Sequence, residues 1–171
     1  MPRGTFTTAE WAMLRLAPWT VAVGVASREP DPTRREFVVV TSAVRRACHH
    51  AAVEPGLIGD IACSLCGRDL PTCRDLGLSD ADRGGRDPGR AAVARCRVIS
   101  EVLGARVGPD EAAQVRSWLV EVASLVAEVA GRGHESCGPL ASTPAREALA
   151  EITDALQVPS GRAEAVAATS G

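Results

Sequence analysis

The amino-acid sequence predicts an all-α protein, a single bundle of five to seven helices over residues 1–158 followed by a disordered tail over residues 159–171. Two observations predict this fold class. Apolar residues recur every three or four positions along most of the chain, which is the spacing of an amphipathic helix, and several of these segments begin with residues that cap helices. No segment shows the alternation expected of a β-sheet, and the chain has no glycine-rich nucleotide-binding motif.

The first predicted helix begins after Thr7. Thr7 and Glu10 have the spacing of a capping box, in which each side chain bonds to the backbone N–H of the other residue. Phe6 and Trp11 occupy the two positions of a hydrophobic staple beside it. Because Pro18 lacks a backbone N–H, we expect it to kink this helix or divide it at the preceding residue.

A second capping box, Thr33 and Glu36, opens a helix that is expected to run to about Val53. The run over residues 37–40 also fits a strand, but the length of the periodic segment and its cap favour a helix. The predicted buried face of this helix holds Phe37, Val40, Val44, Cys48 and Ala51. Pro55 and Gly56 end it, and a short helix follows whose buried face holds Leu57, Ile58, Ile61, Ala62 and Leu65.

The middle of the chain, residues 67–90, is rich in Gly, Asp and Arg and predicts a long mobile loop. Three further helices are expected over about residues 90–103, 109–130 and 143–156, with a turn over 104–108 and Thr143 as the last N-cap. Their predicted inward faces hold Val93, Cys96, Ile99 and Leu103, then Ala112, Val115, Leu119, Val122, Val126 and Val129, then Ala145, Leu149, Ile152 and Leu156.

Composition and charge narrow the classes of function. All 19 basic residues are arginine, a bias typical of high-GC codon usage, as in actinobacteria. A formal net charge of −2 argues against a dedicated nucleic-acid binder. The N-terminus has no apolar signal region, and no apolar stretch is long enough to span a bilayer. We therefore expect a cytoplasmic protein without a membrane partner, in which the six cysteines are thiols or metal ligands rather than disulfides.

The two ends of the chain share an order of features. Residues 11–44 and 118–156 both begin with Trp, run through a Val-Ala pair, cross a loop and restart with a capped helix. Such units would either pack about a pseudo-twofold axis or be two unrelated amphipathic hairpins.

A family resemblance lies in these same two ends. At the N-terminal end it is carried by Glu10-Trp11, Ala17-Pro18, the Val-Ala-Val-Gly-Val-Ala run over 21–26, and Thr33 with Glu36. At the C-terminal end it is carried by Trp118-Leu119, Val122-Ala123, the run over 126–131, and Thr143, Glu147, Leu149, Ile152 and Leu156. In these patterns the chain resembles the TerB-like family of tellurite-resistance proteins, which implies a helical fold.

The resemblance also implies a role for acidic residues. In the TerB-like family, acidic residues of the interhelical loops bind metal ions, which carries over to Glu36 and Glu147 here. The chain departs from the family at residues 27–29, where Ser-Arg-Glu stands in place of an Ala-Asp-Gly step. Alternatively, Glu36 and Glu147 only stabilise the N-termini of their helices through the helix dipole.

A cysteine cluster is the sharpest candidate for a metal site. Cys63 and Cys66 form a Cys-x-x-Cys-Gly motif that resembles a zinc knuckle, and Cys73 is placed to supply a third ligand. The fourth ligand would be Cys48, His49 or His50 at the end of the preceding helix. The alternatives are free thiols that pack as small hydrophobic groups and, less in keeping with a position near a helix end, a redox pair.

The helix over residues 33–53 has a basic side, formed by Arg34, Arg35, Arg45, Arg46, His49 and His50. Arg46 and His50 are therefore candidates for contacting a small anionic ligand or an acidic protein partner. An ordinary solvated helix face is the alternative.

These features favour a TerB-like binding or scaffold protein that recognises a protein partner or a small ligand, with or without a metal ion such as zinc. The alternative is a small enzyme of bacterial specialised metabolism, with an active-site cavity between helices. Homodimerisation through the apolar second side of an amphipathic helix stays open.

Overall fold

The structure, a computed structural model, describes residues 5–28, 34–66, 71, 87–130 and 142–157, with only the backbone described at 34–37. This part of the chain forms seven α-helices and no strand, which confirms the predicted all-α bundle. None of the described helices combines the length and the apolar character that crossing a membrane requires. The helices are α1 (Thr8–Arg15), α2 (Ala17–Ala26), α3 (Arg34–Ala51), α4 (Leu57–Leu65), α5 (Pro88–Arg106), α6 (Pro109–Ala130) and α7 (Thr143–Gln157).

The start of the bundle follows the sequence pattern closely. Thr7 Oγ1 accepts a hydrogen bond from the Glu10 backbone N–H at 3.2 Å, and Glu10 Oε2 accepts one from the Thr7 N–H at 2.7 Å. The rings of Phe6 and Trp11 pack with their centroids 6.3 Å apart. Pro18 lies in the first turn of α2, where its missing N–H leaves no helical bond unmade. The predicted division of the helix before Pro18 is therefore confirmed.

Glu10 also connects α1 to the far end of α5. Arg106 donates to Glu10 Oε1 from Nε at 3.0 Å and from Nη2 at 2.9 Å. The hydrogen bond from the Thr7 backbone, together with Arg106, lowers the pKa of the Glu10 carboxyl below its ordinary value of 4.5. Folding therefore favours the ionised form of this carboxyl.

Replacement of Glu10 with glutamine is expected to reduce the free energy of unfolding at neutral pH. Because the folded-state pKa lies below the unfolded-state value, this contribution is present above about pH 4.5 and is lost as the pH falls through the folded-state pKa. Urea unfolding over a pH series measures it, with Glu101→Gln at an exposed position of α5 as the control. A difference between wild type and E10Q that does not shrink in acid would contradict this assignment.

The connection between α3 and α4 is a tight elbow over residues 52–56. The α3 helix ends at Ala51, two residues before the expected end. Gly56 has φ +86°, a left-handed conformation that glycine adopts without strain. The N–H of Leu57 then donates to Glu111 Oε1 of α6 at 3.1 Å, so a side chain from α6 caps the first turn of α4.

The backbone of this elbow packs directly against Gly59 of α4. A Cβ atom at Gly59 would lie 1.9 Å from the backbone oxygen of Glu54. The close approach of the two backbones therefore depends on the absence of a side chain at this position.

The ends of α5 differ from the prediction. The helix begins at Pro88, inside the expected loop, because Asp87 caps it by accepting a hydrogen bond from the Gly89 N–H at 2.9 Å. Gly89 itself is buried, and a Cβ there would lie 2.7 Å from Arg28 Nε. The helix also continues through Gly104 to Arg106, so the turn expected over 104–108 is limited to residues 107 and 108.

The start of α7 differs by one residue. Thr143 is the first helical residue rather than the N-cap, since Ser142 Oγ accepts the hydrogen bond from the Ala145 N–H at 3.1 Å. Most of the loop expected over 67–90, the tail over 159–171 and the side chains of the Thr33–Glu36 box lie outside the described residues.

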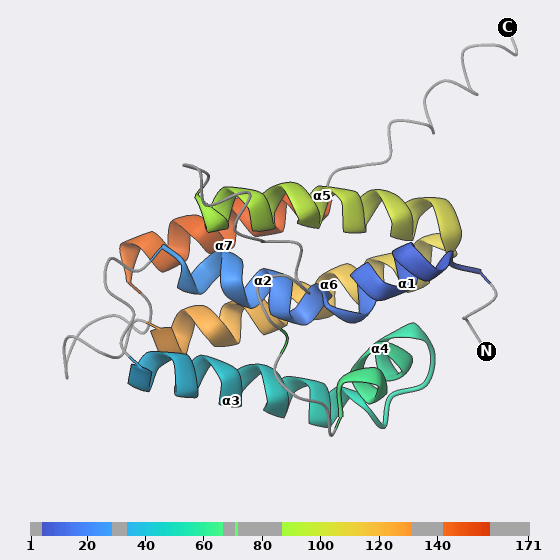
Figure 1. Ribbon diagram of the computed structural model, residues 1–171. Helices are drawn as coiled ribbons and strands as arrows, with labels where there is room; N and C mark the ends of the chain where they lie inside the picture. Colours follow the sequence, from blue (N-terminus) through green and yellow to red (C-terminus); the bar gives the residue numbers. More distant parts are fainter. Residues whose placement is uncertain (1–4, 29–33, 67–70, 72–86, 131–141, 158–171) are drawn as a thin grey trace, which may run out of the picture.

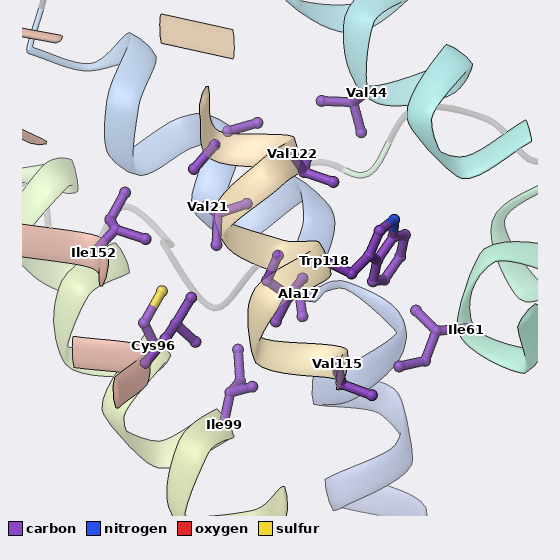
Figure 2. Close-up of a cluster of buried hydrophobic side chains, with 14 of the residues drawn as sticks. Ala17, Val21, Val44, Ile61, Cys96, Ile99, Val115, Trp118, Val122 and Ile152 are labelled. Carbon is purple, nitrogen blue, oxygen red and sulfur yellow. The ribbon is translucent and has the colours of Figure 1, made fainter. Parts of the chain in front are cut away.

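The helices form three tiers around α6 (Figure 1). The α2 and α6 helices make the middle tier, with α5 and α7 on one side and α3 and α4 on the other. In Figure 2, Trp118 and Val115 of α6 face α3 and α4. Cys96 and Ile99 of α5 and Ile152 of α7 lie on the opposite side of α6. The predicted inward residues are buried at nearly every described position, and only Ile58, Leu65, Val129 and Leu149 remain partly exposed.

A buried polar link joins the three helices α5, α6 and α7. Ser100 of α5 is 1% exposed, and its Oγ donates to the backbone oxygen of Leu156 at 2.8 Å. Arg116 of α6 donates to this same Oγ from Nε at 3.0 Å and to the Ser100 backbone oxygen from Nη2 at 2.8 Å. Burial lowers the pKa of the Arg116 guanidinium. The link therefore satisfies polar groups that packing has removed from water.

Candidate ligand-binding groove

A groove opens to solvent between α3, α4 and α6, with a volume of about 570 Å³. This α3–α6 groove is defined by twelve lining residues: Ala47, His50, Ala51, Glu54, Pro55, Ile58, Gln114, Ser117, Trp118, Glu121, Val122 and Leu125. Clefts of roughly 300–1,000 Å³ with an apolar lining and a few polar groups are typical of small-molecule sites. The groove has both the size and the mixed lining of such a site.

Helical periodicity builds the two long walls. On α3 the lining residues Ala47, His50 and Ala51 are spaced at i, i+3 and i+4, which places them along one face. On α6 the same spacing runs from Gln114 to Leu125. Pro55 and Ile58 close one end, and the elbow and the Glu111 cap fix their position. The walls therefore belong to regular helices, which hold side chains more rigidly than loops do.

The floor of the groove is apolar and centres on Trp118. This side chain is only 8% exposed, and Val122 and Ala51 beside it are buried. Figure 2 shows the indole projecting from α6 toward α3 and α4. Its Nε1–H donates to no described residue and is not one of the buried polar atoms that lack a partner, so it reaches solvent. At the rim, Leu125 is 39% exposed and extends the apolar surface outward.

The rim of the groove is polar and carries negative charge. Glu54 and Glu121 are both exposed, and neither carboxylate forms an ion pair with a described residue. His50, Gln114 and Ser117 are the other exposed polar side chains of the lining. The lining contains no arginine, and His50 is its one basic side chain beside the two carboxylates.

Of the residues predicted to bind a ligand or partner, His50 lines this groove. Arg46 is exposed on α3 one turn earlier and is not part of the lining, and Glu147 is exposed on α7, which does not border the groove. The side chain of Glu36 lies outside the described residues. The structure therefore does not bring these four residues together where it describes them.

The predicted zinc ligands are only partly described. Cys63 and Cys66 are exposed near the end of α4, where their thiols donate to the backbone oxygens of Ala52 at 3.2 Å and Ala62 at 3.4 Å. His49 is exposed on α3, and Cys73 lies outside the described residues. Within the described part of the chain, no three His, Cys, Asp or Glu side chains are grouped closely enough to hold a metal ion. A zinc site that includes Cys73 stays a prediction.

The other two described cysteines are buried in the core. Cys48 of α3 is 4% exposed and Cys96 of α5 is fully buried. Burial raises the pKa of each thiol to about 12, and in Cys48 the neighbouring Cys66 adds to the effect. Both thiols are therefore protonated at neutral pH and behave as small hydrophobic groups.

Sequence reasoning missed most of the groove. It named Trp118 for its place in a pattern rather than as part of a site, and it did not single out Glu54, Ser117 or Glu121. The available signal was the second stripe on α6 at 114, 117, 118, 121 and 125, which runs beside the core stripe and includes an aromatic and an aliphatic residue. Within it, Leu125 lies outside the core stripe and adds apolar surface that core packing does not use.

Comparison with known proteins adds no family to this description. No protein-family model matches the chain, and no curated protein or solved structure is significantly similar to it.

Proposed function

We propose that this protein is a non-catalytic helical binding protein that holds the apolar part of a small ligand in the α3–α6 groove. The observation that carries the proposal is the half-enclosed groove of about 570 Å³ with Trp118 in its floor. An aromatic floor inside a polar rim removes the apolar body of a ligand from water while leaving its polar end solvated. The TerB-like fold is part of this proposal, with the resemblance at the chain ends as its support.

The dimensions of the groove favour a small molecule over a large protein surface. A stable protein–protein interface buries about 800 Å² on each partner, usually over a broad and fairly flat area. The groove is instead a local depression bounded by three helices and the elbow. Its openness also favours binding over catalysis, because enzymes enclose reacting groups to exclude water.

The indole N–H signals of the three tryptophans provide a direct test. We expect 2-(naphthalen-1-yl)ethanol, a neutral amphipathic probe, to shift the signal of Trp118 in ¹⁵N–¹H spectra and to leave those of Trp11 and Trp19 unchanged. At about 0.3 kcal/mol per non-hydrogen atom, a probe of this size binds with a Kd on the order of 1 mM. Trp11→Phe and Trp19→Phe variants assign the three signals.

A pair of variants on α6 controls for binding elsewhere. Ser117 and Ala113 are both exposed, but only Ser117 lines the groove. Ser117→Trp is expected to fill the groove and weaken probe binding at least tenfold, whereas Ala113→Trp leaves it unchanged. Failure of the naphthyl alcohol and of its charged analogues to shift the Trp118 signal would overturn the proposed function.

The zinc prediction is independent of the groove and has its own test. If Cys63, Cys66 and Cys73 hold zinc, the purified protein contains about one equivalent of the metal, and the double replacement of Cys63 and Cys66 with serine removes it. Metal-free protein whose serine variant folds normally would contradict the zinc prediction.

A further inference from the structure

We infer that the ligand of the α3–α6 groove is a small organic cation, an apolar body that carries an ammonium group. This inference rests on the proposed function and names the chemical class that the groove selects. The ammonium lies at the rim between Glu54 and Glu121, and the apolar body lies on Trp118.

The charges of the lining support a cation. Two exposed carboxylates border the groove from opposite walls, Glu54 from the elbow after α3 and Glu121 from α6. Neither is paired with an arginine of the described residues. The nearest arginine on α6, Arg116, is turned to the other side of the helix, where it donates to Ser100. The groove therefore attracts positive charge and repels anions.

Trp118 gives a second reason to expect a cation. The side chain is 8% exposed, and its indole N–H, which donates to no described residue, is not one of the buried atoms that lack a partner and so reaches solvent. The electron-rich face of an indole also attracts cations, and tryptophan is the best of the aromatic side chains in this respect. Indole and carboxylates together therefore suit an organic ammonium better than they suit a neutral or anionic ligand.

The position of the basic residues explains why they do not reverse this preference. Arg45 and Arg46 are exposed on α3, but the groove-facing positions of that helix are Ala47, His50 and Ala51. Neither guanidinium is part of the lining: Arg45 lies on another side of α3, and Arg46 lies one turn before His50, outside the lining residues.

Three probes with one naphthyl body test the inference: 2-(naphthalen-1-yl)ethanamine, 2-(naphthalen-1-yl)ethanol and naphthalene-1-acetate. Titration of the full chain, followed at the Trp118 indole signal, is expected to show the amine binding about tenfold more tightly than the alcohol, and the carboxylate binding most weakly. Equal affinities of the amine and the alcohol, or tighter binding of the carboxylate, would overturn the cation assignment and leave the proposed function standing. If none of the three probes binds, the proposed function fails together with the cation assignment.

Matched carboxamide variants separate the rim charges from general electrostatics. Glu121→Gln is expected to weaken amine binding about three- to fivefold without changing alcohol binding, and Glu54→Gln is expected to do the same. Glu128→Gln, exposed on α6 outside the groove lining, changes neither. An equal effect of E128Q and E121Q on the amine would show that net charge, not the rim, sets the preference, and would contradict the inference.

Discussion

Replacing Gly59 with alanine is expected to lower the free energy of unfolding by about 3 kcal/mol, near the upper end for an overpacked site. The new Cβ would lie 1.9 Å from the backbone oxygen of Glu54, and a backbone atom cannot rotate away as a flexible side chain can. Either α4 or the elbow over residues 52–56 must move. Urea unfolding measures the loss, which corresponds to a fall in Tm of roughly 10 °C for a chain of this size.

Gly108→Ala is the control for this prediction. No atom lies within 4 Å of a Cβ built at Gly108, and its backbone is outside the positive-φ region. Its effect is expected to stay below about 1 kcal/mol. If the two variants had the same stability, the close approach of α4 to the elbow would be wrong, and the end wall of the groove with it.

Replacing Ser100 with alanine is expected to cost about 2 kcal/mol, the second large effect. The hydroxyl donates to the Leu156 oxygen at 2.8 Å and accepts from Arg116 Nε at 3.0 Å, so its loss leaves both groups without these partners. The Leu156 oxygen is one of the last carbonyls of α7, which receive no hydrogen bond from an N–H of their own helix. Arg116 is partly withdrawn from water by the same packing.

Ser42→Ala is the matched control, because the Ser42 hydroxyl donates to the Val38 oxygen at 2.8 Å on an exposed face of α3. Alanine has a higher helix propensity than serine, and the Val38 oxygen is accessible to water, so we expect a change within about 0.5 kcal/mol. If S100A were no less stable than S42A, the polar link between α5, α6 and α7 would contribute nothing to the free energy of unfolding.

The helices could be predicted because their signals are local. The Thr7–Glu10 capping box, Pro18 and the core stripe of α6 all lie within a few residues of the structure they specify. Helix ends are harder to predict for the same reason: the sequence predicts loop residues at Gly89 and Gly104, yet Asp87 caps α5 before the first and the helix continues past the second. Glycine is a weak helix former rather than an absolute helix stop.

The groove could not be predicted, because it forms between segments far apart in the chain. His50 and Glu54 come from one wall and Trp118 and Glu121 from another, and no sequence spacing relates the two walls. What brings them together is the packing of α3 on α6 and the capping of α4 by Glu111. The cysteine motif, in contrast, is visible in the sequence, but one of its three cysteines lies outside the described residues.

Intermolecular nuclear Overhauser effects test most directly whether a small ligand binds in the α3–α6 groove. With 2-(naphthalen-1-yl)ethanamine bound to the methyl-labelled protein, we expect contacts from the naphthyl protons to the methyl groups of Ile58 and Leu125, which line the groove. Val38 and Val98 are 57% and 45% exposed elsewhere on the surface and provide the comparison. Contacts to Ile58 and Leu125 alone would confirm the site, whereas contacts to Val38 or Val98 without them would contradict it.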